Sequence, residues 1–145
     1  MISNEGWRNN WLAISPAGAV RVDLTRSGGE RRALERRIRD LRPGTAVVVC
    51  ASAPRAIGRC RAFASGAGIE LDHEYLAFPS AATPAYLVED AAAPVRLFVT
   101  TVLAAPPRTM FSLPIGLGLG LLRALKPWRL VRNIAPGRVV VGRRT

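Results

Sequence analysis

An uninterrupted apolar run, Ala46-Val-Val-Val-Cys50, constrains the fold of this chain more than any other feature. Its β-branched residues favour a strand, and the lack of polar alternation is typical of a strand buried on both faces, as in the middle of a parallel sheet. Ser52 and Pro54 follow as a helix N-cap and a preset first turn. The sequence therefore predicts a buried strand and then a helix that reaches about Ser65.

A second strand is predicted directly after this helix. Between Ile69 and Tyr75 the larger side chains alternate with acidic ones, the pattern of a strand with one exposed face. Strand, helix and strand joined by short turns form a right-handed βαβ unit, which argues for an open α/β sheet. A length of 145 residues fits one domain, residues 1–145.

Other segments carry weaker patterns. The periodicity of Leu34, Ile38 and Leu41 predicts a helix from about Gly28 to Leu41, with Ser27 and Glu30 as a capping box. We also expect strands at 11–14, 19–24 and 139–141, helices at 95–104 and 113–125, and a long loop at 76–94 that contains Tyr86 to Asp90.

The order of the predicted elements from residue 41 onward resembles that of a known protein family. Leu41-Arg42-Pro43-Gly44 precedes Val47-Val48-Val49, a predicted helix follows, and then come Gly68 and the strand from Ile69 to Tyr75. This order is similar to the later half of class I S-adenosylmethionine-dependent methyltransferases, in which an L-x-P-G-G turn leads into the fifth strand. The family's last strand runs antiparallel between its fifth and sixth strands, and Gly137 to Val141 occupies the corresponding place in this sequence.

The resemblance, which covers about Ser27 to Arg143, implies a single α/β, Rossmann-like domain. We expect a small sheet of four to six strands, mostly parallel with an antiparallel closing strand, and helices on both faces. The family has a glycine-rich G-x-G-x-G turn after its first strand and an acid at the end of its second. Here Gly116, Gly118 and Gly120 have this spacing, but they lie inside an apolar run with no predicted strand before them and no acid at the proper distance. We therefore predict no cofactor site and expect no methyl transfer by the chain alone.

Positive charge is concentrated late in the chain. The sequence has 21 basic residues against 10 acidic ones, a formal net charge of +11, and residues 106–145 hold eight bases and no acid. Nucleic acid is a poor candidate partner, because Trp128 is the only aromatic residue among the bases from Arg123 to Arg144 and no recognition motif is present. The use of arginine in place of lysine is also what a GC-rich coding sequence favours, so part of this charge requires no function.

A docking surface for another protein explains both the charge and the apolar run beside it. Residues 106–134 would supply an apolar patch rimmed by basic side chains. The predicted partner-binding residues are Arg108, Phe111, Leu117, Leu121, Arg123, Lys126, Trp128, Arg129 and Arg132.

The leading hypothesis is therefore a non-catalytic or auxiliary methyltransferase-like subunit that binds a partner enzyme. The family resemblance implies a bacterial biosynthetic setting, such as synthesis of a cell-surface glycan or a natural product. One alternative is a minimal or split methyltransferase whose glycine-rich half comes from another chain. Another is an adaptor for an anionic membrane surface, since residues 111–132 form a cationic, amphipathic segment.

Four residues are candidates for chemistry. Cys50 ends a predicted central strand just before a helix N-terminus, which would lower the pKa of a thiol, although a small core residue is the simpler interpretation. His73 is a candidate general base, or a structural or surface histidine. Glu89 and Asp90 could bind a cation or a hydroxyl-rich substrate, or form the solvated start of the next helix.

Metal binding and export are not predicted. Two cysteines and one histidine are too few for a structural zinc site. The segment of the first eight residues is polar as a whole and has no apolar core of a signal peptide, and the uncharged run 109–122 is too short to cross a bilayer. We expect reduced thiols and a cytoplasmic location.

Overall fold

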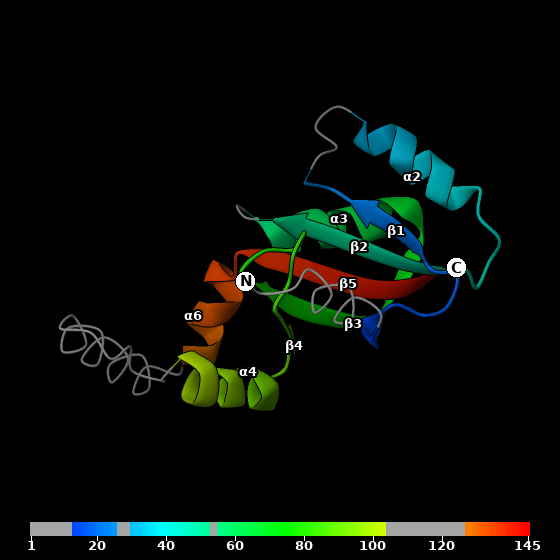
Figure 1. The fold of residues 1–145 in the computed structure, drawn as a ribbon. Coiled ribbons are helices and arrows are strands. Elements are labelled where there is room, and N and C mark those ends of the chain that lie inside the picture. Colours follow the sequence, from blue (N-terminus) through cyan, green and yellow to red (C-terminus); the bar gives the residue numbers. More distant parts are fainter. Residues whose placement is uncertain (1–12, 26–29, 53–54, 104–126) are drawn as a thin grey trace. The chain divides into compact units, whose positions relative to one another are not determined.

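The structure is a computed structural model that describes residues 13–25, 30–52, 55–103 and 127–145. The chain forms two compact units, the first made of residues 1–87 and 135–145 and the second of residues 88–134. In chain order the elements are β1 (Val20–Asp23), α2 (Arg31–Arg39), β2 (Ala46–Ser52), α3 (Ala56–Ala67), β3 (Ile69–Phe78), β4 (Tyr86–Glu89), α4 (Ala92–Phe98), the π-helical turn η1 (Val99–Leu103), α6 (Pro127–Ile134) and β5 (Gly137–Arg144) (Figure 1).

The five strands form one mixed sheet in the order β1-β2-β5-β3-β4. β1 pairs with β2 in parallel, whereas β5 pairs antiparallel with both β2 and β3. Because β2 and β3 are both antiparallel to β5, they run in the same direction as each other and as β1. The predicted α/β class, the number of strands and the antiparallel closing strand are confirmed.

Two apolar cores lie on opposite faces of the sheet. On one face, Val49 of β2 and Val140 of β5 pack with Phe63 of α3 and Ile38 of α2. The second core contains six buried residues: Val48, Cys50, Ala77, Ala81, Val139 and Val141. The predicted burial of the run 46–50 on both faces is confirmed by Val47, Val48, Val49 and Cys50, none of which is more than 1% exposed.

In the described part of the first unit, the helices α2 and α3 cover one of these faces, and the other has only the short helical stretch at Ala13 and Ile14. α3 contacts β2, β5 and β3, and α2 packs against α3 (Figure 1). The other core is completed by partly buried side chains that include Ile14, Tyr75 and Leu87. The expectation of helices on both faces is therefore met on one face in this part of the chain.

Both predicted helix starts need correction. α2 begins at Arg31, with Glu30 itself at the N-cap position, while Ser27 lies outside the described residues. Ser52 is the last residue of β2 and does not cap α3, which begins at Ala56 after Arg55 in the left-handed region with φ 60°. The periodicity located both helices, but the capping signals gave starts a few residues too early.

β3 carries a bulge that the alternating pattern did not predict. Leu71 pairs with Gly142 and His73 pairs with Val141, so Asp72 is an extra residue in the ladder. Residues after the bulge therefore face the opposite side of the sheet from the one that strict alternation assigns to them. Glu74 consequently pairs with Val140 and turns toward α3, where its carboxylate receives two hydrogen bonds from Arg61, at 2.9 and 3.0 Å.

Two further segments differ from expectation and two agree. Ala13 and Ile14 are helical, whereas 11–14 was predicted as a strand, and residues 86–89, predicted to lie in a loop, form β4. The predicted strand at 19–24 is β1, and the helix predicted at 95–104 corresponds to α4 and η1. The helix predicted at 113–125 lies outside the described residues.

Among the residues that are described, no helix has the length and apolar character needed to cross a membrane.

Substitution of Gly142 tests the packing of β5 against β3. A Cβ at Gly142 would lie 2.2 Å from the backbone oxygen of Glu70, whereas one at Gly58 in α3 would meet nothing within 4 Å. We expect Gly142→Ala to lower the free energy of unfolding by about 3 kcal/mol, because a backbone atom in mid-sheet has little room to move. Gly58→Ala should raise it by about 0.5 kcal/mol. Urea unfolding of the two variants measures both changes, and equal effects would contradict the pairing of β5 with β3.

Candidate functional site

Most of the predicted partner-binding residues fall outside the described part of the chain. Arg108, Phe111, Leu117, Leu121, Arg123 and Lys126 belong to this group. Trp128 and Arg129 lie in α6, but their side chains are not described. Arg132, in the same helix, is the member of the set whose contacts are defined.

Arg132 forms an ion pair inside the second unit. Its Nη2 atom donates to Oδ2 of Asp90 at 3.1 Å, and its Nε atom lies 2.5 Å from Oδ1. The Asp90 side chain is only 2% exposed. Removing either partner would leave a charge without its counterion, so we infer that the pair fixes α6 to the segment that precedes α4.

The second unit also presents apolar side chains to solvent. Leu97 of α4 is 63% exposed, and Leu130 and Ile134 of α6 are 49% and 64% exposed. Leu130 and Ile134 are four residues apart and therefore lie on the same face of α6. Val131, between them in sequence, is buried, so α6 has an inner apolar side and an outer one.

Three late arginines have structural roles in the first unit. Arg138 of β5 is 1% exposed and lies 3.9 Å from the carboxylate of Glu74. Arg144 donates from Nε and Nη2 to the carbonyl of Arg39, the last residue of α2. Arg143 pairs with Asp72 at 3.3 Å. The basic residues of segment 106–145 are therefore only partly available as a charged surface for a partner.

Arginine also supports the ends of other elements. Both Nε and Nη2 of Arg39 donate to the carbonyl of Gly66 near the end of α3, and Arg59 donates to the carbonyl of Leu24 after β1. Unsatisfied carbonyls at a helix C-terminus attract cations, and a planar guanidinium can donate to one of them through two nitrogens. These contacts give several arginines a physical role that the composition alone did not suggest.

The thiol of Cys50 is not an activated nucleophile. Its side chain is fully buried, and burial raises its pKa to about 11, with the nearby carboxylate of Asp23 adding to the increase. The expectation of a lowered pKa is wrong because the apolar core, not the helix N-terminus, dominates its surroundings. Cys60 is likewise buried, with a pKa raised to about 12 mainly by burial, and both cysteines are free thiols.

The other candidate residues do not assemble into a catalytic group. His73 is exposed, and its ring centroid lies 6.2 Å from that of Tyr75. Asp90 is held by Arg132 while Glu89 is exposed, so the interpretation of this pair as a solvated helix start is wrong for Asp90. Within the described ranges, no three His, Cys, Asp or Glu side chains are placed to hold a metal ion.

The carboxyl ends of β1 and β2 carry a small polar cluster. Asp23 accepts a hydrogen bond from the Thr25 amide at 2.8 Å, and the Thr25 hydroxyl accepts one from the Ser52 amide at 3.2 Å. Ligands of open α/β sheets bind at this end of parallel strands. Here the polar atoms bond to one another and join the two strand ends.

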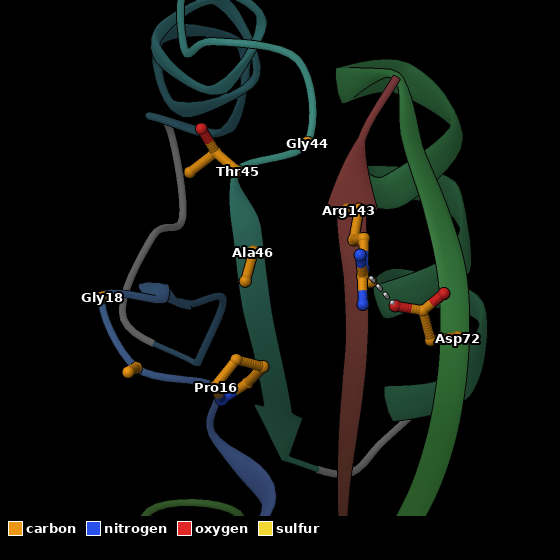
Figure 2. Close-up of a pocket in the computed structure, with 9 residues that line it drawn as sticks. Pro16, Gly18, Gly44, Thr45, Ala46, Asp72 and Arg143 are labelled. Carbon is orange, nitrogen blue, oxygen red and sulfur yellow. Dashed lines mark hydrogen bonds and ion pairs between the residues drawn. The ribbon is translucent and has the colours of Figure 1, made fainter.

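A hollow of about 370 Å³ lies at the opposite ends of these strands (Figure 2). It is lined by Pro16, Ala17, Gly18, Gly44, Thr45, Ala46, Asp72, Gly142 and Arg143. Figure 2 shows Arg143 facing Asp72 on one side of β2 and the turn at Pro16 and Gly18 on the other. Both glycine turns were visible in the sequence, but only the parallel pairing of β1 with β2 brings them together.

Comparison with known proteins adds no family. No protein-family model matches the chain, and no curated protein matches it.

The two buried thiols predict a loss of stability at high pH. Their pKa values are raised to about 11 and about 12 from the ordinary value of 9.0, so the folded state keeps these protons to higher pH than the unfolded state does. The free energy of unfolding should therefore fall as pH rises from about 9 toward about 11. Urea unfolding between pH 8 and pH 11 measures this slope, and Cys50→Ala should make it shallower. An unchanged slope in that variant would contradict a buried, protonated Cys50.

Proposed function

We propose that this chain is an auxiliary subunit, similar in fold to the later half of class I methyltransferases, that binds a partner enzyme through residues 106–134. The observation that carries the proposal is the outer apolar face of α6, formed by the exposed Leu130 and Ile134. The setting implied by the family resemblance is a bacterial biosynthetic system that makes a cell-surface glycan or a natural product.

The strand order supports the methyltransferase-like part of the proposal. An antiparallel strand between two parallel ones, β5 between β2 and β3, is the arrangement that the sequence resemblance implied. The G-x-G-x-G spacing at residues 116–120 lies in an apolar run with no predicted strand before it, unlike the turn with which that family holds its cofactor. A fold of this kind without that turn fits a supporting subunit better than an independent enzyme.

The contacts in the second unit favour a protein partner over a membrane surface. Large exposed aliphatic side chains are typical of the core of a protein interface, with charged residues at its rim. Arg132, one of the bases of the proposed cationic face, is paired with Asp90 and contributes less net charge to that face. An acidic partner surface would complement the remaining bases of residues 106–134, because that segment contains no acid.

A split methyltransferase remains the second candidate, and the edge of the sheet favours it. In the described part of the chain β1 pairs only with β2, which leaves the backbone groups on its other side for a further strand. A partner chain could add strands there and supply the glycine-rich half.

Reconstitution with an isolated partner tests the leading proposal. Proteins that co-purify with the chain from its native cell would be identified, expressed, and mixed with the pure chain. We expect a complex with a biosynthetic enzyme that persists at high salt, because an apolar interface is not screened. The double variant Leu130→Ser, Ile134→Ser should weaken binding by about tenfold or more, since two buried aliphatic side chains are lost. Arg32→Gln, on the exposed side of α2, is the control and should bind normally.

Three results would reject the leading proposal. Tight binding of S-adenosylmethionine by the pure chain would indicate an independent enzyme. Salt-sensitive sedimentation with anionic vesicles, without a protein complex, would indicate a membrane adaptor. A reconstituted methyltransferase that needs β1 but is indifferent to Leu130 and Ile134 would favour the split enzyme.

A further inference from the structure

The hollow beside β2 has walls that are fixed by backbone hydrogen bonds. The Gly44 amide donates to the Arg144 carbonyl at 2.7 Å, and the Arg144 amide donates to the Thr45 carbonyl at 2.9 Å. On the opposite wall the Ala19 amide closes the turn on the Pro16 carbonyl at 3.0 Å. The cavity is thus formed before any ligand arrives, and about 370 Å³ is within the range of sites for small molecules.

Glycine permits the backbone conformation of the two turns that border this hollow. Gly18 and Gly44 have φ values of +73° and +82°, a conformation that residues with a Cβ rarely adopt. A Cβ built at either position would meet no atom within 4 Å, so both turns border open space. Gly142, on the β5 side, could not carry a Cβ without meeting the Glu70 backbone.

Two opposite charges face this space with bonding capacity left over. Arg143 is 70% exposed, and Nε is the one nitrogen of its guanidinium that has a hydrogen-bond partner among the described residues, Oδ2 of Asp72 at 3.3 Å. The two terminal nitrogens of Arg143 and the Oδ1 atom of Asp72 are therefore available. Thr45 also lines the hollow, but its hydroxyl donates to the Arg42 carbonyl at 2.6 Å and points away from Arg143 and Asp72 (Figure 2).

From this geometry we propose that the hollow binds a small zwitterion, a carboxylate with an ammonium group close to it, as in a free amino acid. The carboxylate receives hydrogen bonds from the terminal nitrogens of Arg143, whose planar fork matches its two oxygens. The ammonium group donates to the carboxylate of Asp72. A phosphate dianion is a poorer ligand, because Asp72 repels the second negative charge.

Amide chemical shifts of the ¹⁵N-labelled chain test this site directly. Glycine, L-alanine and L-serine are the zwitterionic probes, acetate is the anion without an ammonium group, and inorganic phosphate is the dianion. We expect saturable shifts at the amides of Gly18, Gly44 and Gly142 with the zwitterions. Acetate and phosphate should bind about tenfold or more weakly, because each lacks the hydrogen bonds made by the ammonium group.

Charge variants assign the roles of the two side chains. Arg143→Gln should weaken zwitterion binding by about tenfold or more, and Arg143→Lys should do so to a smaller extent because it keeps the charge but loses the fork. Asp72→Asn should remove the preference for zwitterions over acetate. Arg32→Gln, an exposed arginine of α2, is the matched control and should bind as the unaltered chain does.

The same spectra show whether each variant is folded. If Arg143→Gln does not fold, Arg143→Lys takes its place in the test. Absence of saturable shifts with any zwitterion would overturn the proposal. So would phosphate binding as tightly as the amino acids, or undiminished binding by a folded Arg143 variant. This proposal is independent of the partner interface in the second unit, so failure of one leaves the other intact.

Discussion

The backbone pairing of β5 on both of its sides is the interaction on which the rest of the structure depends. β5 separates β2 from β3, and its residues Val139, Val140 and Val141 supply apolar side chains to both cores. A strand buried on both edges and both faces needs an apolar centre, here Val139 to Val141, and finds its backbone hydrogen bonds within the sheet. β5 also carries Arg143 to the small hollow and Arg138 to the buried contact with Glu74.

Much of the fold could be predicted from apolar patterning. The continuous run at 46–50 and the periodic Leu34, Ile38 and Leu41 report burial directly, and the structure places both as expected. The bulge at Asp72 could not be predicted, because it depends on how β3 aligns with a strand more than sixty residues later. From that position onward, alternation assigned side chains to the wrong faces, and Glu74 was expected outside but bonds to Arg61.

The candidate sites were harder to predict than the fold. Cys50 lies in the buried strand as expected, although β2 continues to Ser52, and the pKa of its thiol depends on the surrounding core, which the local sequence does not contain. The hollow requires two turns and two strand ends from four parts of the chain. The arginines illustrate the same limit, because a composition that suggested a charged surface includes guanidinium groups that bond to carbonyls near the ends of α2 and α3.

Cross-strand nuclear Overhauser effects around Val140 test the central claim most directly. The structure pairs Val140 with Val49 of β2 on one side and with Glu74 of β3 on the other, both antiparallel. The expected result is short backbone proton contacts from Val140 to both residues, continuing to Cys50 and Tyr75 opposite Val139. Contacts directly between β2 and β3, with β5 at an edge of the sheet, would contradict this account.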